Sequence, residues 1–364
     1  RRVLFRSRKR RPTKPLAVMV PSVAACAGFA RVSAAERRLL EGPERPVVLV
    51  ARRVEGAPLA PGVAPGRVEV GVMLPGFALH CLLLDPDADG TPMPPVVMTS
   101  GNLSGDPMEH ENRAALHRLG PLADGFLFHD RDIHLPCDDS VTRVAAGHVI
   151  PIRRSRGAAP LAIPLADDGP DILAVGGELK AAVGVARGRQ AWISQHLGDL
   201  GSPESLETLE RTARHLLALF DVRPRAVVAD LHPGYLSAGA AARLAAALGV
   251  PLVRVPHHEA HAAALLADAH ASGDAAAPRP LVVATFDGSG YRVGAEGATI
   301  AGGEFFVVEE TAAGRCFRHA ATLEPFPLPG GDAAILHPWR TALSLLHAAD
   351  VPWDRSLAPV RAAG

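Results

Sequence analysis

The chain has 364 residues, 48% hydrophobic and 4% aromatic, a length that is too great for one ordinary domain and fits two. Its 38 basic and 38 acidic residues leave no net charge, which argues against a chain built mainly to bind nucleic acid. No membrane span and no signal peptide are expected, because apolar runs of sufficient length are missing, and four scattered cysteines without C-x-x-C spacing favour a cytoplasmic location.

Residues 1–160 show the pattern of a mixed α/β domain. The segment 111–124 has helical spacing, and apolar runs predict strands at 45–53, 68–75, 78–84, 94–102, 125–130 and 148–157. The Pro- and Asp-rich segment LAIPLADDGPD (161–171) follows and is the best candidate for a linker. We therefore expect one domain over 1–160 and a second over 171–364.

The second domain opens with strands joined by Gly-containing turns over 172–197. Ser202 and Pro203 predict the capped start of a helix that ends at 219. Strands and helices then alternate, with strands at 225–232 and 251–258, a helix at 236–249, a helix within 255–270 and a Gly-rich strand pair over 281–309. The pieces VGGELKAAVGVARGRQAWI and FDGSGYRVGAEGATIAGGEF are weakly alike, which predicts a duplicated unit with two halves facing a cleft.

The segment VPHHEAHAAALLADAH concentrates histidines at the start of a helix. His257 and His261 are four residues apart and share one helix face, so they can aim at one metal ion. The alternative is that they are solvated or hydrogen-bonded in a core. His258 faces about 100° away, from the helical period of 3.6 residues, and Glu259 is expected to be solvated or to support the site indirectly.

Lysine is rare, since only Lys9, Lys14 and Lys180 occur among the 38 basic residues. A compact ammonium is a different ligand from the planar guanidinium of arginine, so a retained lysine suggests a specific need, although chance survival explains it equally well.

A strand that ends in Asp-Gly-Ser-Gly and turns back presents backbone N–H groups and a carboxylate to a phosphate. Most such turns are ordinary, but a matching hairpin lies about 110 residues earlier. We therefore expect a phosphate site between two hairpins, with Lys180 taking a phosphate role. Its predicted members are Gly176, Gly177, Lys180, Asp287, Gly288, Ser289, Gly302 and Gly303.

Eleven motifs in order resemble the HypF family, the carbamoyltransferases of nickel–iron hydrogenase maturation. They are KRRPTKPLAVM, GVMLPGFALHCLLL, VMTSGNLSGDP, CDDSVTR, PIRRSRG, GGELK, SQHLGDL, DLHPGYLS, HHEAH, FDGSGY and LPGGDAA followed by PWR. The resemblance covers nearly the whole chain. It implies a YrdC-like mixed α/β adenylating domain followed by a TsaD-like duplicated α/β domain of the actin-like ATPase superfamily.

The resemblance also implies a reaction. Carbamoyl phosphate and ATP, with Mg²⁺, give carbamoyl adenylate, and the carbamoyl group then passes to the C-terminal cysteine of the partner HypE, on the way to the cyanide ligands of the hydrogenase iron. Such chemistry needs positive charge around clustered phosphates. The expected nucleotide-binding residues of the first domain are Lys9, Arg11, Lys14, Ser100, Asn102, Ser140, Arg154, Ser155 and Arg156.

In the TsaD-like family the H-x-x-x-H helix and the Asp of the D-G-x-G turn bind a divalent metal. The matching positions here are His257, His261 and Asp287. Imidazole and carboxylate ligands suit one Zn²⁺ or Fe²⁺. Asp287 is thereby expected to act with Lys180 in catalysis, and the metal interpretation becomes the favoured one for these histidines.

The sequence also departs from the family pattern. The acylphosphatase-like domain, the paired C-x-x-C zinc fingers and the first strand and helix of the YrdC-like domain are missing, as are the later Gly-rich motif and the final acidic metal ligand. We therefore expect a fragment truncated at both ends, with weakened nucleotide and metal binding and possible loss of activity.

Three other interpretations remain. Antibiotic O-carbamoyltransferases share both domains but place the TsaD-like unit first, and tRNA threonylcarbamoyl enzymes usually use separate chains. The third alternative is a non-catalytic fragment that only docks HypE. Retention of K-x-R-P, TSGN and HHEAH argues against it.

Overall fold

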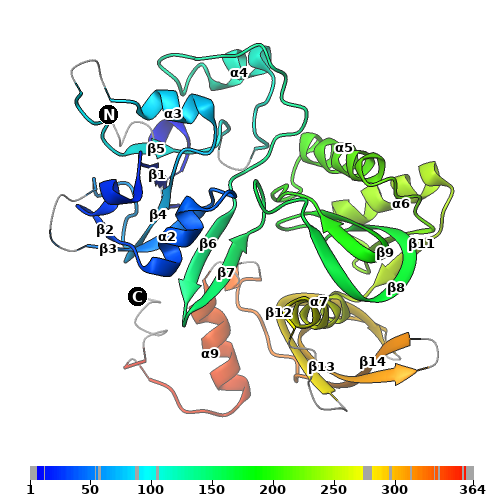
Figure 1. Ribbon diagram of the computed structural model, residues 1–364. Helices are drawn as coiled ribbons and strands as arrows, with labels where there is room; N and C mark the ends of the chain where they lie inside the picture. The colour runs from blue at the N-terminus through cyan, green and yellow to red at the C-terminus, as the bar shows by residue number, and fades with distance from the viewer. Residues whose placement is uncertain are drawn as a thin grey trace. The chain divides into compact units, whose positions relative to one another are not determined.

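The computed structural model describes residues 6–11, 13–53, 55, 59–86, 90–103, 106–273, 281–294, 297–311, 314–331, 333–334, 337–354 and 356–357. Contacts between Cα atoms divide the chain into two compact units (Figure 1). The first unit comprises Arg1–Ala229 and Tyr235–Val253, and the second comprises Asp230–Gly234 and Arg254–Gly364. This division differs from the sequence domains 1–160 and 171–364, whose boundaries stay a prediction.

The first unit begins with a mixed seven-stranded sheet in the order β5-β1-β4-β3-β6-β7, with β2 paired to β3. Strand β1 runs parallel to β4, and β3 runs parallel to β6. The strands are β1 (Ala17–Met19), β2 (Ala30–Arg31), β3 (Val47–Arg52), β4 (Glu69–Met73), β5 (Val96–Met98), β6 (Val141–Ala145) and β7 (His148–Arg153).

Short helices accompany this sheet: η1 (Val23–Cys26), α2 (Ala34–Glu41), α3 (Ala78–Leu84) and α4 (Asn112–Leu119). A capping box between Ser33 and Glu36 starts α2. The core beneath the sheet is apolar, with Val18, Val48 and Val72 at most 1% exposed. The strands therefore bury a continuous apolar core.

Two predicted strands of this region are wrong. Residues 78–84 form α3 instead, because ALHCLLL has no β-branched residue and a short apolar run does not by itself distinguish helix from strand. Residues 125–130 form no strand, and within the described chain they have no strand partner. Leu127 is 72% exposed while the Phe126 and Phe128 rings stack on each other. Both runs are apolar, as the sequence shows, but neither pairs with a strand in the described part of the chain.

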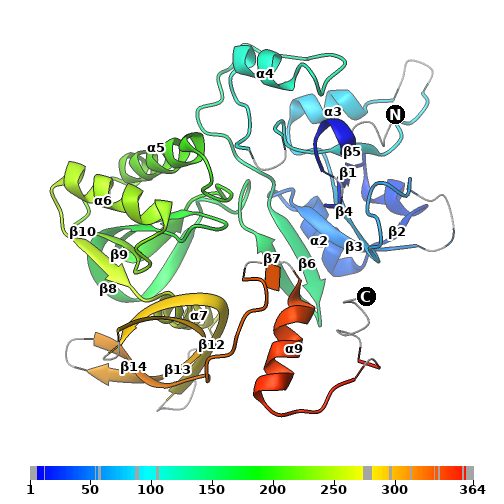
Figure 2. The ribbon, with the colours of Figure 1, turned by 180° about the vertical axis from the view of Figure 1, so that it is seen from behind.

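A second sheet, whose strands belong to the first unit except for the ends of β10 and β11, has the order β11-β10-β8-β9. It consists of β8 (Ala162–Val175), β9 (Val183–Ile193), β10 (Ala226–Asp230) and β11 (Leu252–Val255), and two helices, α5 (Pro203–Leu219) and α6 (Leu236–Leu248), pack on it around a shared apolar core. Figure 2 shows these two helices side by side. Ser202 caps α5 as predicted, with Pro203 in its first turn.

The predicted linker 161–171 is wrong as a structural interpretation, because this segment is the first part of β8. Its Pro and Asp residues are tolerated for a local reason. Strand β10 pairs with β8 only at Ile172–Val175, so Pro164 has β9 as its one strand neighbour. The register with β9 also shifts between Pro164 and Gly169.

The second unit contains an antiparallel sheet, β12 (Leu281–Gly294), β13 (Gly297–Thr311) and β14 (Gly314–Thr322), and the helices α7 (His257–Ala271) and α9 (Pro338–Ala348). Helix α7 packs against β12 and β13 through Ala262, which is fully buried with Phe306 and Val308 (Figures 1 and 2). The pairing of β12 with β13 shifts register between Phe286 and Gly290. Asp287 lies inside this irregular segment, near the first turn of α7.

None of the helices in the described part of the chain has the length and apolar character that crossing a membrane requires. All four cysteines are free.

Candidate functional site

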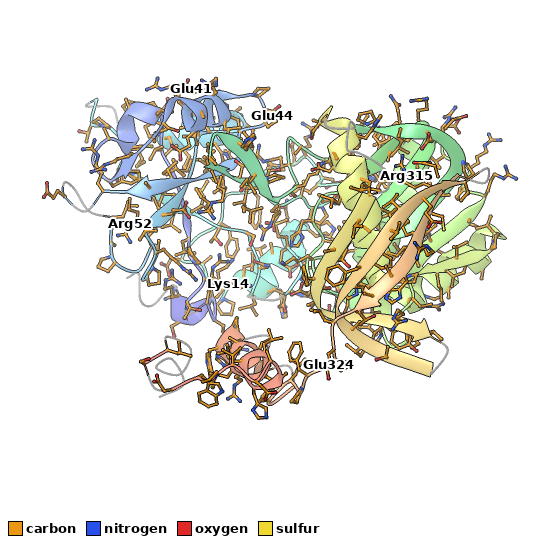
Figure 3. The ribbon with its side chains drawn as sticks, turned by 90° about the horizontal axis from the view of Figure 1, so that it is seen from below. Lys14, Glu41, Glu44, Arg52, Arg315 and Glu324 are labelled. Atoms are coloured by element: carbon orange, nitrogen blue, oxygen red, sulfur yellow. The ribbon has the colours of Figure 1, made fainter. Side chains whose placement is uncertain are left out.

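The first unit contains a cavity of about 350 Å³ at the end of its first sheet. Four cations line it, namely Lys9, Arg11, Lys14 and Arg153, and we call it the cation cavity. Its other polar lining residues are Thr99, Ser100, Asn102, Asp106, Asp138, Asp139, His196, Asp199 and Thr208. Lys14, labelled in Figure 3, is exposed, so the cavity opens to solvent on that side. The lining thus holds four cations and four carboxylates, its cations can bind phosphate oxygens, and its volume suits a ligand of nucleotide size.

Lys9 joins two of the predicted motifs. Its ammonium donates to the Ser100 carbonyl and to Asn102 Oδ1, the latter at 3.1 Å, and the Ser100 hydroxyl donates to the same amide oxygen at 2.7 Å. Only 2% of Lys9 is exposed. Burial, followed by the nearby Arg11 charge, lowers the pKa of Lys9 to about 8. An ammonium held in this way gains more from an incoming phosphate than a solvated one does.

The RRSR segment divides its roles differently from the sequence prediction. Arg153, which was not predicted, lines the cation cavity and contacts Asp138 at 2.8 Å. Arg154 instead donates to the carbonyls of Ile193 and Leu161. Arg156 pairs with Asp139 at 2.7 Å, and that carboxylate lines the cavity. The run therefore supplies one lining cation directly, and Arg156 acts through its partner.

Ser140 and Ser155 are buried below this segment. The Ser140 hydroxyl accepts from the Ser155 N–H and donates to the Arg156 carbonyl, both at 2.9 Å. These bonds fix the backbone that follows β7 and do not place either hydroxyl in the cavity lining. Their nucleotide-binding role stays a prediction.

The loop SQHLGDL, between β9 and α5, also reaches the cation cavity. His196 and Asp199 line it, and the backbone N–H of His196 donates to the Arg154 carbonyl at 3.2 Å. Burial, then the Arg153 charge, lowers the pKa of His196. Asp199 Oδ1 accepts from the Lys180 N–H at 2.8 Å, so the exposed turn that carries Lys180 is tied to a cavity residue.

The two predicted phosphate hairpins belong to different compact units. Gly176, Gly177 and Lys180 lie in the first unit, between β8 and β9, whereas the hairpin with Asp287 lies in the second. Gly288 and Ser289 continue the irregular part of β12, and Gly302 and Gly303 lie on β13 opposite it. A phosphate site that joins both hairpins, and the catalytic role of Lys180 in it, stay predictions.

The second unit brings the predicted metal ligands together. His257 Nε2 is 2.8 Å from Asp287 Oδ2 and 3.2 Å from His261 Nε2, and His261 Nε2 is 3.8 Å from Asp287 Oδ2. We call these three residues the histidine cluster. The two imidazoles come from successive turns of α7, and the carboxylate comes from the register shift in β12.

The spacing of the histidine cluster fits a metal ion. Tetrahedral bonds of about 2.0–2.1 Å place ligand atoms about 3.3 Å apart, and the observed separations lie on both sides of that value. The three ligand atoms all lie within 4.8 Å of one another. Two nitrogens and a carboxylate oxygen suit Zn²⁺ or Fe²⁺ and leave further positions for oxygen atoms of a substrate.

Asp230, at the end of β10, completes this arrangement and was not predicted. Its Oδ2 is 2.6 Å from His257 Nδ1, so Nε2 of that ring is directed at Asp287. The hydrogen bonds that His257 donates to Asp230 and then to Asp287 raise the pKa of His257 to about 9. Burial alone would raise the pKa of Asp230, but bonds from His257 and the His232 N–H bring it below its ordinary value. The carboxylates thus favour positive charge on or beside this ring, from a proton or a metal.

The neighbours His258 and Glu259 are not part of the histidine cluster, as expected. His258 is 1% exposed and its Nδ1 lies 2.9 Å from Glu304 Oε2. Glu259 is half-buried, and burial raises its pKa. One signal could have found Asp230 from the sequence: it ends an apolar strand, where functional side chains commonly project.

Comparison with known protein families gives three matches along the chain. Residues 2–155 match the Sua5–YciO–YrdC family, described as "Telomere recombination". Residues 167–268 match "HypF Kae1-like domain", and residues 283–362 match "Carbamoyltransferase, Kae1-like Domain, second subdomain". The three matches follow the order that the motifs predicted.

Several curated proteins are similar over nearly the whole chain. "Carbamoyltransferase HypF2" of Cupriavidus necator is 44% identical over 94% of this chain, and "Carbamoyltransferase HypF" of Rhizobium leguminosarum is 40% identical over 95%. The chain covers 42% and 43% of these relatives, so it spans about two fifths of their length.

Two solved structures share the fold. A crystal structure of full-length HypF in the phosphate- and nucleotide-bound form has a TM-score of 0.80 at 36% identity, and that of T. kodakarensis HypF has 0.82 at 34%. Each comparison covers 95% of this chain and 43% of the other. The predicted fold class, a YrdC-like mixed α/β domain followed by a TsaD-like one, is confirmed by the YrdC and Kae1-like matches.

Proposed function

Because this chain belongs to the HypF carbamoyltransferase family, we propose that it carries out ATP-dependent carbamoyl transfer in hydrogenase maturation. The acceptor is the C-terminal cysteine of HypE, and the carbamoyl donor is carbamoyl phosphate. Since the chain spans two fifths of its relatives, the activity of the whole protein, its substrates and its partner are all part of this proposal, as is a cytoplasmic location.

The observation that carries the proposal is the cation cavity with Lys9 at its base. A nearly buried ammonium, held by a carbonyl and an amide oxygen, has donors directed by its neighbours before any ligand arrives. Arg11, Lys14 and Arg153 add positive charge on the same cavity. ATP with Mg²⁺ is the ligand that matches this charge and the family.

The first step forms carbamoyl adenylate. Carbamoyl phosphate and water give carbamate and inorganic phosphate, and a carbamate oxygen then bonds to the α-phosphorus of ATP while pyrophosphate leaves. Lys9 and Arg153 stabilise the charge that develops on the phosphate oxygens. Asn102 and Ser100 orient the Lys9 ammonium, so their effect on the reaction passes through it.

The second step uses the histidine cluster. His257, His261 and Asp287 would hold a divalent ion, which would supply Lewis acidity for the transfer. Asp230 holds His257 so that Nε2 remains directed at that ion. The acceptor thiolate bonds to the carbamoyl carbon, and AMP leaves.

The first test is exchange of labelled pyrophosphate into ATP by the 364-residue chain. Carbamate is supplied from carbamoyl phosphate in one arm and from ammonium bicarbonate in another. The second arm is needed because hydrolysis of carbamoyl phosphate is a separate reaction from adenylation. Exchange that requires a carbamate source is expected. Calorimetric titration with ATP and Mg²⁺ measures binding independently of turnover.

Two matched variants make this test specific. Lys9→Ala should reduce exchange and ATP affinity about tenfold, since it removes one charged hydrogen-bond donor. Arg37→Ala removes an exposed cation of α2 that pairs with Glu41 at 3.5 Å, and it should change neither. Exchange without a carbamate source, or equal effects of the two variants, would refute the adenylation step. Transfer to HypE, and no transfer to HypE lacking its C-terminal cysteine, tests the acceptor.

A further inference from the structure

A buried group of ionisable side chains lies next to the histidine cluster in the second unit. Glu304 on β13 and His258 on α7 are each 1% exposed and lie 2.9 Å apart. Glu304 Oε1 is also 2.7 Å from Arg292 Nε and 3.3 Å from His319 Nε2. Moving such charges out of water costs free energy that their mutual attraction does not always offset. Well-packed apolar residues would therefore stabilise a small sheet at least as well as these charged ones. We therefore explain these buried ionisable side chains by the backbone and side chains that they hold in place.

The His258 ring is pressed against the backbone of the irregular segment of β12. A Cβ atom added to Gly290 would lie 2.4 Å from His258 Cε1 and 2.5 Å from its Nδ1. No real Cβ contact is that short, and the ring cannot swing away because it is buried and bound to Glu304. The last glycine of DGSG is thus required by the middle histidine of HHEAH.

This contact joins the two elements that carry the histidine cluster. His258 follows His257 directly on α7, and Gly290 ends the register shift in which Asp287 lies. A displacement of α7 relative to β12 would change the Asp287 distances to both ligand nitrogens. Metal ligands must be placed within tenths of an ångström, so such a contact sets affinity.

We propose that His258, Glu304 and Gly290 are positioning residues that hold Asp287 opposite His257 and His261. The inference rests on the metal centre of the proposed function. His258 binds no metal in this scheme, because its Nδ1 is committed to Glu304 and its ring faces Gly290. Glu304 fixes the ring, and Arg292 neutralises the second carboxylate oxygen.

The test is a titration of the 364-residue chain with Co²⁺, followed by its visible absorption. Gly290→Ala keeps all three ligand side chains but pushes the β12 segment and α7 apart. It should weaken Co²⁺ binding about 10- to 100-fold, the range found when groups that orient metal ligands are removed. The shape of the cobalt spectrum should also change, since the ligand geometry differs.

Matched variants separate positioning from general stability. Glu310 lies on the same strand as Glu304 and pairs with Arg315 at 2.9 Å, but this pair is partly exposed; Arg315 is labelled on β14 in Figure 3. Glu310→Gln should leave the cobalt affinity unchanged, whereas Glu304→Gln should weaken it while conserving shape. Circular dichroism at the titration temperature establishes that each variant is folded.

The outcomes distinguish this inference from the metal centre itself. If the wild-type chain binds no Co²⁺, the metal centre fails and the positioning role falls with it. If the wild type binds but folded Gly290→Ala and Glu304→Gln bind equally well with an unchanged spectrum, the positioning role alone is refuted. Should Gly290→Ala not fold, Glu304→Gln decides by the same two readouts.

Discussion

The cation cavity and the histidine cluster differ in how precisely their side chains must be placed. The cavity collects charges from segments as far apart as Lys9 and Asp199, and its residues need only surround an anion. The cluster takes two ligands from one helix and a third from one irregular strand, and all three must meet at a point. We therefore expect graded losses when the cavity is altered and near-complete loss when the cluster is.

The largest expected effect comes from removing metal ligands of the histidine cluster. His257→Ala/His261→Ala removes two of the three ligand atoms, so metal affinity should fall by more than about 100-fold, beyond the effect of losing a supporting group. Elemental analysis after loading with Zn²⁺ or Fe²⁺ measures the content. His270→Ala, near the other end of α7, should retain the wild-type content. Equal metal in the double variant would return these histidines to an ordinary hydrogen-bonding role.

A supporting residue of the cluster should have the next largest effect. Asp230→Asn keeps the shape of the side chain but removes the charge that faces His257 Nδ1 at 2.6 Å. The affinity for Zn²⁺ should fall about 10- to 100-fold. Competition with a chromogenic chelator measures it, and an unchanged affinity would show that Asp287 alone orients the ring.

The difference between the two sites also explains what the sequence could reveal. The i, i+4 spacing of His257 and His261 fixes a shared helix face, whereas Asp287 and the preference for a metal site came from the family resemblance. Asp230 escaped because its partner lies 27 residues later and only the end of β10 brings them together.

The cavity was harder to predict residue by residue. Strand side chains alternate between faces, so a run such as RRSR cannot say which of its arginines faces the anion. Arg153 does so, while the next guanidinium binds backbone carbonyls. His196 was quoted within a motif but received no role, since its contact with the cavity depends on tertiary structure.

The fold showed the same limit. Capped or long periodic elements such as α5 were predicted well, because local chemistry fixes them. The short apolar run 78–84 was assigned to strand and forms α3, and 161–171 was assigned to a linker and pairs in β8. In both cases the decisive factor was the presence or absence of a strand partner, which sequence periodicity does not contain.

Within the cavity, removal of one cation should give a moderate loss. Lys14→Met takes away an exposed ammonium while three other cations remain, so ATP affinity should fall about threefold, which is less than for Lys9→Ala because the exposed charge is screened by water. Calorimetry at constant ionic strength measures both variants. A loss for Lys14→Met as large as that for Lys9→Ala would show that the cavity, too, depends on each ligand.

The last expected effect is a pH dependence of ATP binding that originates at Lys9. Its pKa in the free protein is about 8, below the ordinary value of 10.5, so it binds a proton less readily than a solvated lysine. Phosphate binds the ammonium form, whose fraction drops from about 0.9 at pH 7 to about 0.24 at pH 8.5 when the pKa is 8. Affinity should therefore decrease about fourfold over this range, and binding above pH 8 should take up a proton.

The lowered pKa of Lys9 also makes the free energy of unfolding depend on pH. The unfolded chain binds the Lys9 proton more tightly than the folded chain does, so the free energy of unfolding should rise as pH increases from about 8 towards 10.5. Lys9→Arg is the matched variant, because its guanidinium stays charged throughout and should remove the pH dependence of ATP affinity whatever its absolute value. Calorimetry in buffers of different ionisation enthalpy measures the proton uptake directly. A wild-type affinity that is flat between pH 7 and 8.5 would show that Lys9 is fully protonated there and that burial does not control its charge.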